Sequence, residues 1–195
     1  YYGDNAEYSY FEGCSQGGRQ AFMSAQRYPQ DFDGIIAGAP AFNYQGLNAA
    51  GTWNLQRIFR DNLVGNLAAD STGDGSPDSL ALLDKLHDRV LLKCDARDGV
   101  QDGVIGDPLA CDFNPSVDLS DLMCPSDKAG SDCFTTAQLQ TINDLYNGPS
   151  DSSGRAVYPG KMFGSELRWA GYYIPWQGND MGPSKLMGVA GDHMN

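Results

Sequence analysis

The chain has 195 residues and a formal net charge of −12, with 13 basic side chains against 25 acidic ones. So acidic a chain lacks the basic patches that nucleic acids and anionic membrane surfaces require, which excludes both as partners. Hydrophobic residues make up 41 % of the chain, enough for a folded core, yet no apolar run reaches the length of a membrane span.

The first predicted elements surround a serine. An aromatic run from Tyr8 to Phe11 predicts a strand, and Gly18–Tyr28 is compatible with a helix. Between them stands Gly-Cys-Ser-Gln-Gly, a Gly-x-Ser-x-Gly motif in the strand–turn–helix context of a nucleophile elbow. Ser15 is therefore the candidate nucleophile, and the backbone N–H of Gln16 is the candidate donor to an oxyanion. A plain glycine-rich turn is the alternative, because the chain has 24 glycines.

A second strand is predicted at Gly34–Gly38, directly after the helix. Strand, helix and strand within about 30 residues form one βαβ unit of a parallel sheet. The beginning of the chain is therefore expected to belong to an α/β fold.

Two separate stretches resemble the tannase and feruloyl esterase family. The first runs roughly from Tyr8 to Phe42 and includes Gly-Cys-Ser-Gln-Gly-Gly-Arg-Gln and Asp-Phe-Asp-Gly-Ile-Ile-Ala-Gly-Ala-Pro-Ala; the second is Cys94–Ile105. The resemblance implies a secreted serine esterase with an α/β-hydrolase fold and a large inserted lid. It also implies that residues 1–44 are part of the catalytic domain, and that residues 45–195 form a mixed lid stabilised by disulfides and calcium.

Farther along the chain, helices are predicted at Ala49–Asn62, Ser79–Leu92 and Thr135–Tyr146. The apolar face of the second helix consists of Leu82, Leu83, Leu86 and Val90. The acidic Asp70–Asp78 loop is expected to bind no metal, because Ala81 stands where an EF-hand needs a glutamate.

Triad chemistry needs a base, and the chain has only two histidines. His87 lies in the Ser79–Leu92 helix and is expected to be solvated or partly packed. His193 follows Asp192 but is not preceded by a cysteine, which departs from the family pattern. The catalytic Asp and His are therefore expected outside this chain. Because it has neither a starting methionine nor a signal peptide, the chain is predicted to be an inactive fragment of an active enzyme.

Five cysteines indicate an oxidising compartment, either secreted or periplasmic. Four of them allow three pairings, of which Cys94–Cys111 with Cys124–Cys133 is the simplest. Each loop of this length would contribute about 3 kcal/mol to stability. The family resemblance implies that Cys14 pairs with a cysteine outside this chain.

The segment from Cys94 to Asp107 is a candidate calcium loop, because three carboxylates lie close enough in sequence to converge on one ion. An acidic, solvated turn is the alternative. By resemblance, the ligands of a structural Ca²⁺ are three carboxylates and two backbone oxygens, those of Asp95, Asp98, Asp102, Val100 and Val104.

The Phe163–Trp176 segment is dense in aromatic residues. It predicts either lid core or the wall of a pocket for an aromatic acid. The candidates for the pocket are Trp169, Tyr172, Tyr173 and Trp176.

The resemblance implies hydrolysis of esters of hydroxybenzoic or hydroxycinnamic acids, as small molecules or in plant polymers, through a serine acyl-enzyme. One alternative is a serine hydrolase of other acyl substrates. The other is a calcium-stabilised extracellular binding module without catalysis. Nothing in the sequence indicates an oligomeric state.

Overall fold

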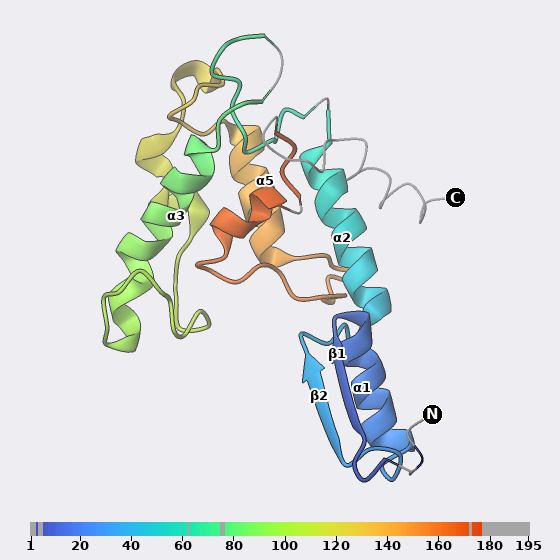
Figure 1. Cartoon of the computed structure of the whole chain (residues 1–195). Helices are drawn as coiled ribbons and strands as arrows, with labels where there is room; N and C mark the ends of the chain where they lie inside the picture. Colours follow the sequence, from blue (N-terminus) through green and yellow to red (C-terminus); the bar gives the residue numbers. More distant parts are fainter. Residues whose placement is uncertain (1–2, 4–5, 62, 75–76, 172, 177–195) are drawn as a thin grey trace. The chain divides into compact units, whose positions relative to one another are not determined.

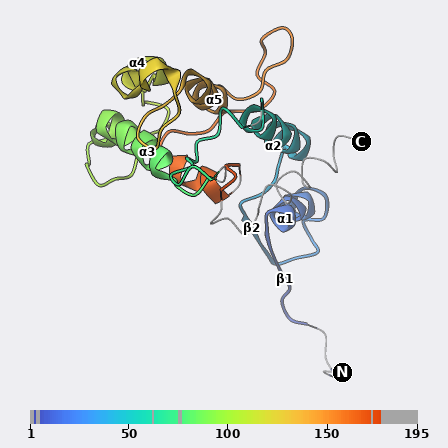
Figure 2. The same ribbon diagram turned by 90° about the horizontal axis from the view of Figure 1, so that it is seen from above.

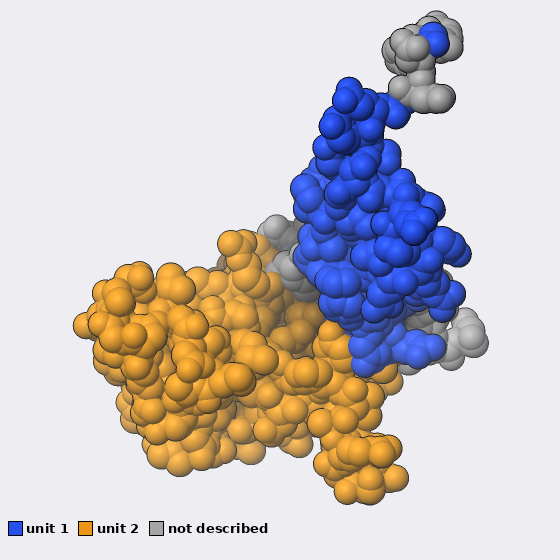
Figure 3. All heavy atoms as spheres, turned by 90° about the horizontal axis from the view of Figure 1, so that it is seen from below, with its two compact units in different colours: residues 1–48 blue, residues 49–195 orange. Residues whose placement is uncertain are grey.

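The computed structural model describes residue 3 and residues 6–61, 63–74, 77–171 and 173–176. Two compact units make up the chain, residues 1–48 and residues 49–195 (Figure 3). The division falls inside helix α2 (Tyr44–Ile58), near the boundary at 44–45 that the sequence predicts.

The first unit is one βαβ motif, as the sequence predicts. Strands β1 (Tyr10–Cys14) and β2 (Gly34–Gly38) pair in parallel, with Tyr10 opposite Gly34 and Cys14 opposite Gly38. Helix α1 (Gln16–Arg27) runs along one face of the pair (Figure 1) and buries Ala21 completely. Because the two strands are parallel, both end on the same side of the sheet, and the candidate nucleophile Ser15 directly follows the last residue of β1 there.

Helix α2 begins and ends earlier than predicted. The side chain of Asn43 accepts a hydrogen bond of 3.0 Å from Gly46 N–H, which satisfies one of the free donors at the helix start. The helical pattern of the sequence alone does not indicate this cap. The helix ends at Ile58, and Asp61 follows with a φ of 47°, a backbone conformation that cannot continue a helix.

The second unit is mainly helical, and α3, α4 and α5 gather in it (Figure 2). Its elements are α3 (Ala81–Cys94), η1 (Asp95–Asp98), α4 (Pro115–Asp118), η2 (Ser120–Leu122), η3 (Pro125–Asp127), α5 (Thr136–Asn147) and η4 (Glu166–Gly171). None of the helices in the described ranges is long and apolar enough to cross a membrane.

The core of the second unit lies where α3, α5 and η4 meet. The predicted apolar face of α3 is confirmed, because Leu82, Leu83, Leu86 and Val90 are all buried. Ile142 and Leu145 of α5 pack into the same core. Burial of each such side chain contributes about 1.5–3 kcal/mol relative to exposure.

Local features hold the helices of this unit in place. Thr135 is the N-cap of α5 and forms a capping box with Gln138, with hydrogen bonds of 3.2 and 2.9 Å between side chain and backbone. Disulfides join Cys94 to Cys111 and Cys124 to Cys133, the simplest pairing from the sequence.

Candidate active site

Ser15 occupies the turn between β1 and α1. Its backbone has a φ of 59° and a ψ of −112°, a left-handed conformation that is rare outside glycine. A strained residue at such a point indicates a functional constraint, because the surrounding structure must hold it there. A positive φ at the serine is the backbone geometry expected of a nucleophile elbow.

Three backbone hydrogen bonds hold the turn. Ser15 N–H donates to Gly38 O at 3.0 Å, which ties the serine to the end of β2. The carbonyl of Ser15 accepts from Arg19 N–H at 3.1 Å and from Ala41 N–H at 3.2 Å. Both strand ends and the first turn of α1 therefore fix the position of the nucleophile.

Glycines let the backbone pass close to itself around the serine. A Cβ added at Gly13 would overlap the backbone of Gly17, and one added at Gly18 would overlap the carbonyl oxygen of Gly38. A Cβ at Gly17 would meet no atom within 4 Å. Gly18 lies just outside the Gly-x-Ser-x-Gly motif, and its lack of a side chain lets α1 approach β2.

These glycines give a test of the elbow geometry. We expect Gly18→Ala to destabilise the chain by about 1–3 kcal/mol, because the new methyl group is forced against backbone. Gly17→Ala is the matched control one residue away. We expect it to be neutral or stabilising by up to about 1 kcal/mol, since alanine favours a helix. Urea unfolding of both variants measures the difference, and equal stabilities would contradict the close packing of α1 on β2.

Ser15 is flanked by Gln16 and Cys14, and a hollow lies beside Gln16. Gln16 is the first residue of α1, so its N–H is one of those that lack an acceptor within the helix. A hollow of about 400 Å³ lies beside it, lined by Gln16, Arg19, Gln20 and Met23, but not by Ser15. Cys14 is exposed and, within the described residues, forms no disulfide.

The first unit, which holds Ser15, contains no histidine in its sequence. In the second unit, the Nδ1 atom of His87 lies 2.7 Å from Glu166 Oε2. His193 lies outside the described residues. Ser15 therefore remains a candidate nucleophile without an assigned base among the described residues.

The candidate calcium loop is closed by its own backbone. Asp95 accepts hydrogen bonds from Gly103 N–H at 3.1 and 3.2 Å and from Asp102 N–H at 3.3 Å. Asp98 accepts from Val100 N–H and Gly106 N–H, at 3.0 and 2.6 Å, and these bonds hold the pKa of its carboxyl below the usual range.

Carboxylate and carbonyl oxygens are the ligands that calcium prefers, but the carboxylates of this loop accept hydrogen bonds from its own backbone N–H groups. Among the described residues, no group of three or more acidic, histidine or cysteine side chains is arranged to hold a metal ion. Asp102 likewise bonds to Val104 N–H at 3.0 Å. The loop in this arrangement is stabilised by hydrogen bonds between carboxylates and backbone.

The aromatic segment is mainly core. Trp169 is 2 % exposed, and its ring packs edge-on against Tyr146 at 5.3 Å between centroids. Its side chain therefore cannot form the wall of an open pocket. Tyr173 and Trp176 are half-buried against the core, and Tyr172 lies outside the described residues.

A buried carboxyl group lies in the same region. Glu166 is completely buried and lies 2.7 Å from His87 Nδ1, while Tyr146 O–H and Gly164 N–H donate to its other oxygen at 2.7 and 2.8 Å. Burial, then the Glu166 charge, raises the pKa of Tyr146 far above its usual range, so the phenol remains a donor. His87 is thus a partner in a polar network and not a solvated residue.

Glu166 is not among the residues predicted from the sequence. The available signal was one acidic residue within an aromatic stretch, which must find partners if the stretch forms a core.

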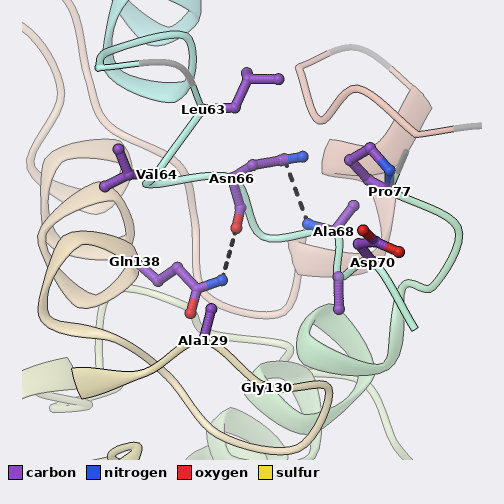
Figure 4. A pocket seen from close by; sticks show the side chains of 10 residues that line it. Leu63, Val64, Asn66, Ala68, Asp70, Pro77, Ala129, Gly130 and Gln138 are labelled. Atoms are coloured by element: carbon purple, nitrogen blue, oxygen red, sulfur yellow. Dashed lines mark hydrogen bonds between the residues drawn. The ribbon is translucent and has the colours of Figure 1, made fainter. Parts of the chain in front are cut away.

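A second hollow of about 400 Å³ lies in the second unit (Figure 4). The amides of Asn66 and Gln138 face it, but each is already bonded. Gln138 Nε2 donates to Asn66 O at 2.8 Å, and Asn66 Oδ1 accepts from Ala68 N–H at 3.3 Å (Figure 4). The hollow therefore presents amide groups that hold the protein's own backbone.

Known proteins match most of the chain. A family model described as tannase and feruloyl esterase matches residues 1–191. The probable feruloyl esterase B of Aspergillus clavatus is 37 % identical over 172 residues, which cover 88 % of this chain and 30 % of that protein. The probable feruloyl esterase B-1 of Aspergillus flavus is 35 % identical over 167 residues, with 86 % and 29 % covered.

Solved structures agree with the sequence matches. Feruloyl esterase B from Aspergillus oryzae superposes with a TM-score of 0.68 at 32 % identity, over 86 % of this chain and 31 % of that one. Tannin acyl hydrolase from Aspergillus niger gives a TM-score of 0.58 at 26 % identity, over 83 % and 28 %. The chain thus spans less than a third of the length of these relatives. Together, the matches show that this chain belongs to the tannase and feruloyl esterase family.

Proposed function

We propose that the full-length protein hydrolyses carboxylic esters of aromatic acids through an acyl-enzyme on Ser15. The observation that carries the proposal is the left-handed backbone of Ser15 at the junction of β1 and α1. In this role the Ser15 hydroxyl attacks the ester carbonyl, the alcohol leaves, and water then releases the acid. The N–H of Gln16, at the positive end of α1, donates to the oxyanion.

The catalytic acid and base of this reaction are proposed to lie outside the described residues. The support is that His87 bonds to Glu166 within the second unit, and that the matched part of this chain covers only 30–31 % of the similar proteins. The 195-residue chain alone is accordingly expected to have no ester turnover. Cys14, exposed beside the nucleophile, is proposed to pair with a cysteine outside the chain.

Hydroxycinnamoyl esters are the proposed substrates, because feruloyl esterases are among the similar proteins. Residues 45–195 would then be the lid, with Tyr172, Tyr173 and Trp176 as candidates for contact with an aromatic acid. The two disulfides support a secreted or periplasmic location.

The test uses the full-length protein, a fluorophosphonate probe, and a panel of methyl ferulate, methyl gallate and short-chain acyl esters. We expect covalent labelling at Ser15 and turnover of methyl ferulate. Labelling with turnover of short-chain esters alone would replace the aromatic substrate by other acyl groups. A folded protein without labelling would reject the catalytic role and favour a binding module.

A structural calcium ion is proposed for the loop of Asp95, Asp98 and Asp102, with the backbone oxygens of Val100 and Val104. The proposal rests on the hard oxygen ligands that this segment concentrates. A carboxylate oxygen that accepts one N–H bond keeps a lone pair for a cation. The ion would stiffen the loop and take no part in ester chemistry.

Removal of calcium should destabilise the protein. We expect EDTA to lower the melting temperature of the full-length protein by roughly 5–10 °C, through loss of ligand-linked stability. Calcium should restore it, and Asp98→Asn should remove the dependence. Asp151→Asn, in another loop closed by backbone bonds to a carboxylate, is the control and should keep it. A melting temperature insensitive to EDTA would leave the acidic turn as the correct interpretation.

A further inference from the structure

Two arginines approach one carboxylate in the second unit. Arg57 lies in the last turn of α2, and Arg60 follows the helix end. Arg57 Nε and Arg60 Nη1 each lie 3.8 Å from the same atom, Oδ2 of Asp144 in α5. Both separations exceed the length of a hydrogen bond. The charges are therefore paired without direct hydrogen bonds at this oxygen.

Buried polar atoms without a hydrogen-bond partner gather around these arginines. Across the ranges that the structure describes, there are four such side-chain atoms, which are Asn54 Oδ1, Arg57 Nε, Arg60 Nη2 and Asp144 Oδ2. Asn54 is 2 % exposed and stands one helical turn before Arg57. Buried polar groups in native proteins nearly always have a partner, so four in one region require a common explanation.

The balance of donors and acceptors identifies the partner. Two of the atoms donate and two accept. An anion would satisfy the two arginines but face the oxygens of Asn54 and Asp144. A metal cation would bind the oxygens but face the arginines. Only a group that both donates and accepts twice matches the set, and water does so.

The aromatic ring of Trp53 orients one of the donors. The Arg57 guanidinium lies 4.7 Å from the centre of this ring. Stacking of this kind holds a guanidinium without using its N–H groups. The Nε–H edge of Arg57 is therefore free to point toward Asp144, and the gap of 3.8 Å is one that a bridging water spans.

We propose that an ordered, buried water molecule binds between the end of α2 and α5. It accepts from Arg57 Nε–H and Arg60 Nη2–H, and it donates to Asn54 Oδ1 and Asp144 Oδ2. This water links the last turn of α2 to α5 through one site in place of direct salt bridges.

An atomic-resolution crystal structure of the full-length protein tests the site. We expect one peak that refines as water, at roughly 2.7–3.2 Å from at least three of the four atoms. Direct hydrogen bonds from the arginines to Asp144 with no peak between them would overturn the proposal. So would a chloride or carboxylate peak, or a polar side chain from elsewhere in the protein in this position.

A double-mutant cycle tests the same site in solution. Asn54 and Asp144 are not hydrogen-bonded to each other, but the water makes them depend on each other. We expect the unfolding constant of Asn54→Ala with Asp144→Ala to depart at least about twofold from the product of the single changes. The control cycle pairs Asn54→Ala with Asp121→Ala, whose carboxylate binds Arg89 in a different, exposed ion pair. For the control pair, the change in the unfolding constant of the double variant should equal the product of the two single changes. The same departure from this product in both cycles would overturn the proposed water bridge.

Discussion

Ser15→Ala in the full-length protein is expected to lower kcat for methyl ferulate by roughly 10⁴–10⁶-fold, the loss that follows removal of a catalytic serine. Alanine removes the hydroxyl that forms the acyl-enzyme and leaves the N–H of Gln16 in place. The variant should therefore still bind ester with a similar affinity. Steady-state hydrolysis and probe labelling measure the loss.

Backbone strain makes alanine a clean control for folding. Both serine and alanine carry a Cβ, so both bear the same cost at a φ of 59°. Unfolding curves of wild type and Ser15→Ala should therefore coincide. A variant that keeps most of its activity would show that another residue is the nucleophile and would reduce the elbow to a strained turn.

The second large effect concerns stability. His87→Leu should destabilise the protein by about 1–3 kcal/mol, the cost of leaving a buried carboxyl oxygen without its hydrogen-bond partner. Glu166 has no exposed surface, so water cannot replace the imidazole. The remaining donors, Tyr146 and Gly164, both bond to the other carboxyl oxygen. Urea unfolding gives the measurement.

A neighbouring pair on the same helix provides the comparison. Arg89 also lies on α3 and pairs with Asp121, which is 62 % exposed. Arg89→Leu should cost far less than His87→Leu, because exposed ion pairs are weak and solvent can replace the partner. In addition, His87→Leu with Glu166→Leu should be less harmful than the sum of the single changes. Similar costs at positions 87 and 89 would contradict the importance of the buried network.

The sequence predicted the elements that local chemistry determines. The Gly-x-Ser-x-Gly turn, the apolar face of α3 and the helix that begins near Thr135 each depend on residues close together in the chain, and the structure contains all three. The start of α2 could also have been found locally, because Asn43 is a good cap that the helical pattern alone does not reveal.

Contacts between residues that lie far apart in the sequence could not be predicted from local patterns. His87 and Glu166 lie 79 positions apart, and only the packing of η4 on α3 brings them together. The same applies to Gly18, whose need for a small side chain comes from the carbonyl of Gly38. For Trp169, the aromatic composition of its segment is compatible with both a pocket wall and a core, and the structure shows that the side chain is buried in the core.

The positive φ of Ser15 lowers the stability of the folded chain at the very position where the proposed chemistry needs a serine. Glycine adopts a φ of 59° without steric penalty, so Ser15→Gly should make the chain more stable than the wild type while removing the nucleophile. The relief of strain, about 1–3 kcal/mol, outweighs the greater freedom of glycine in the unfolded chain, about 0.4–1 kcal/mol. A melting curve of Ser15→Gly beside Ser15→Ala would show it. Selection for stability alone would thus favour glycine at this position, and the proposed role of the hydroxyl as nucleophile gives a reason why serine is found there instead.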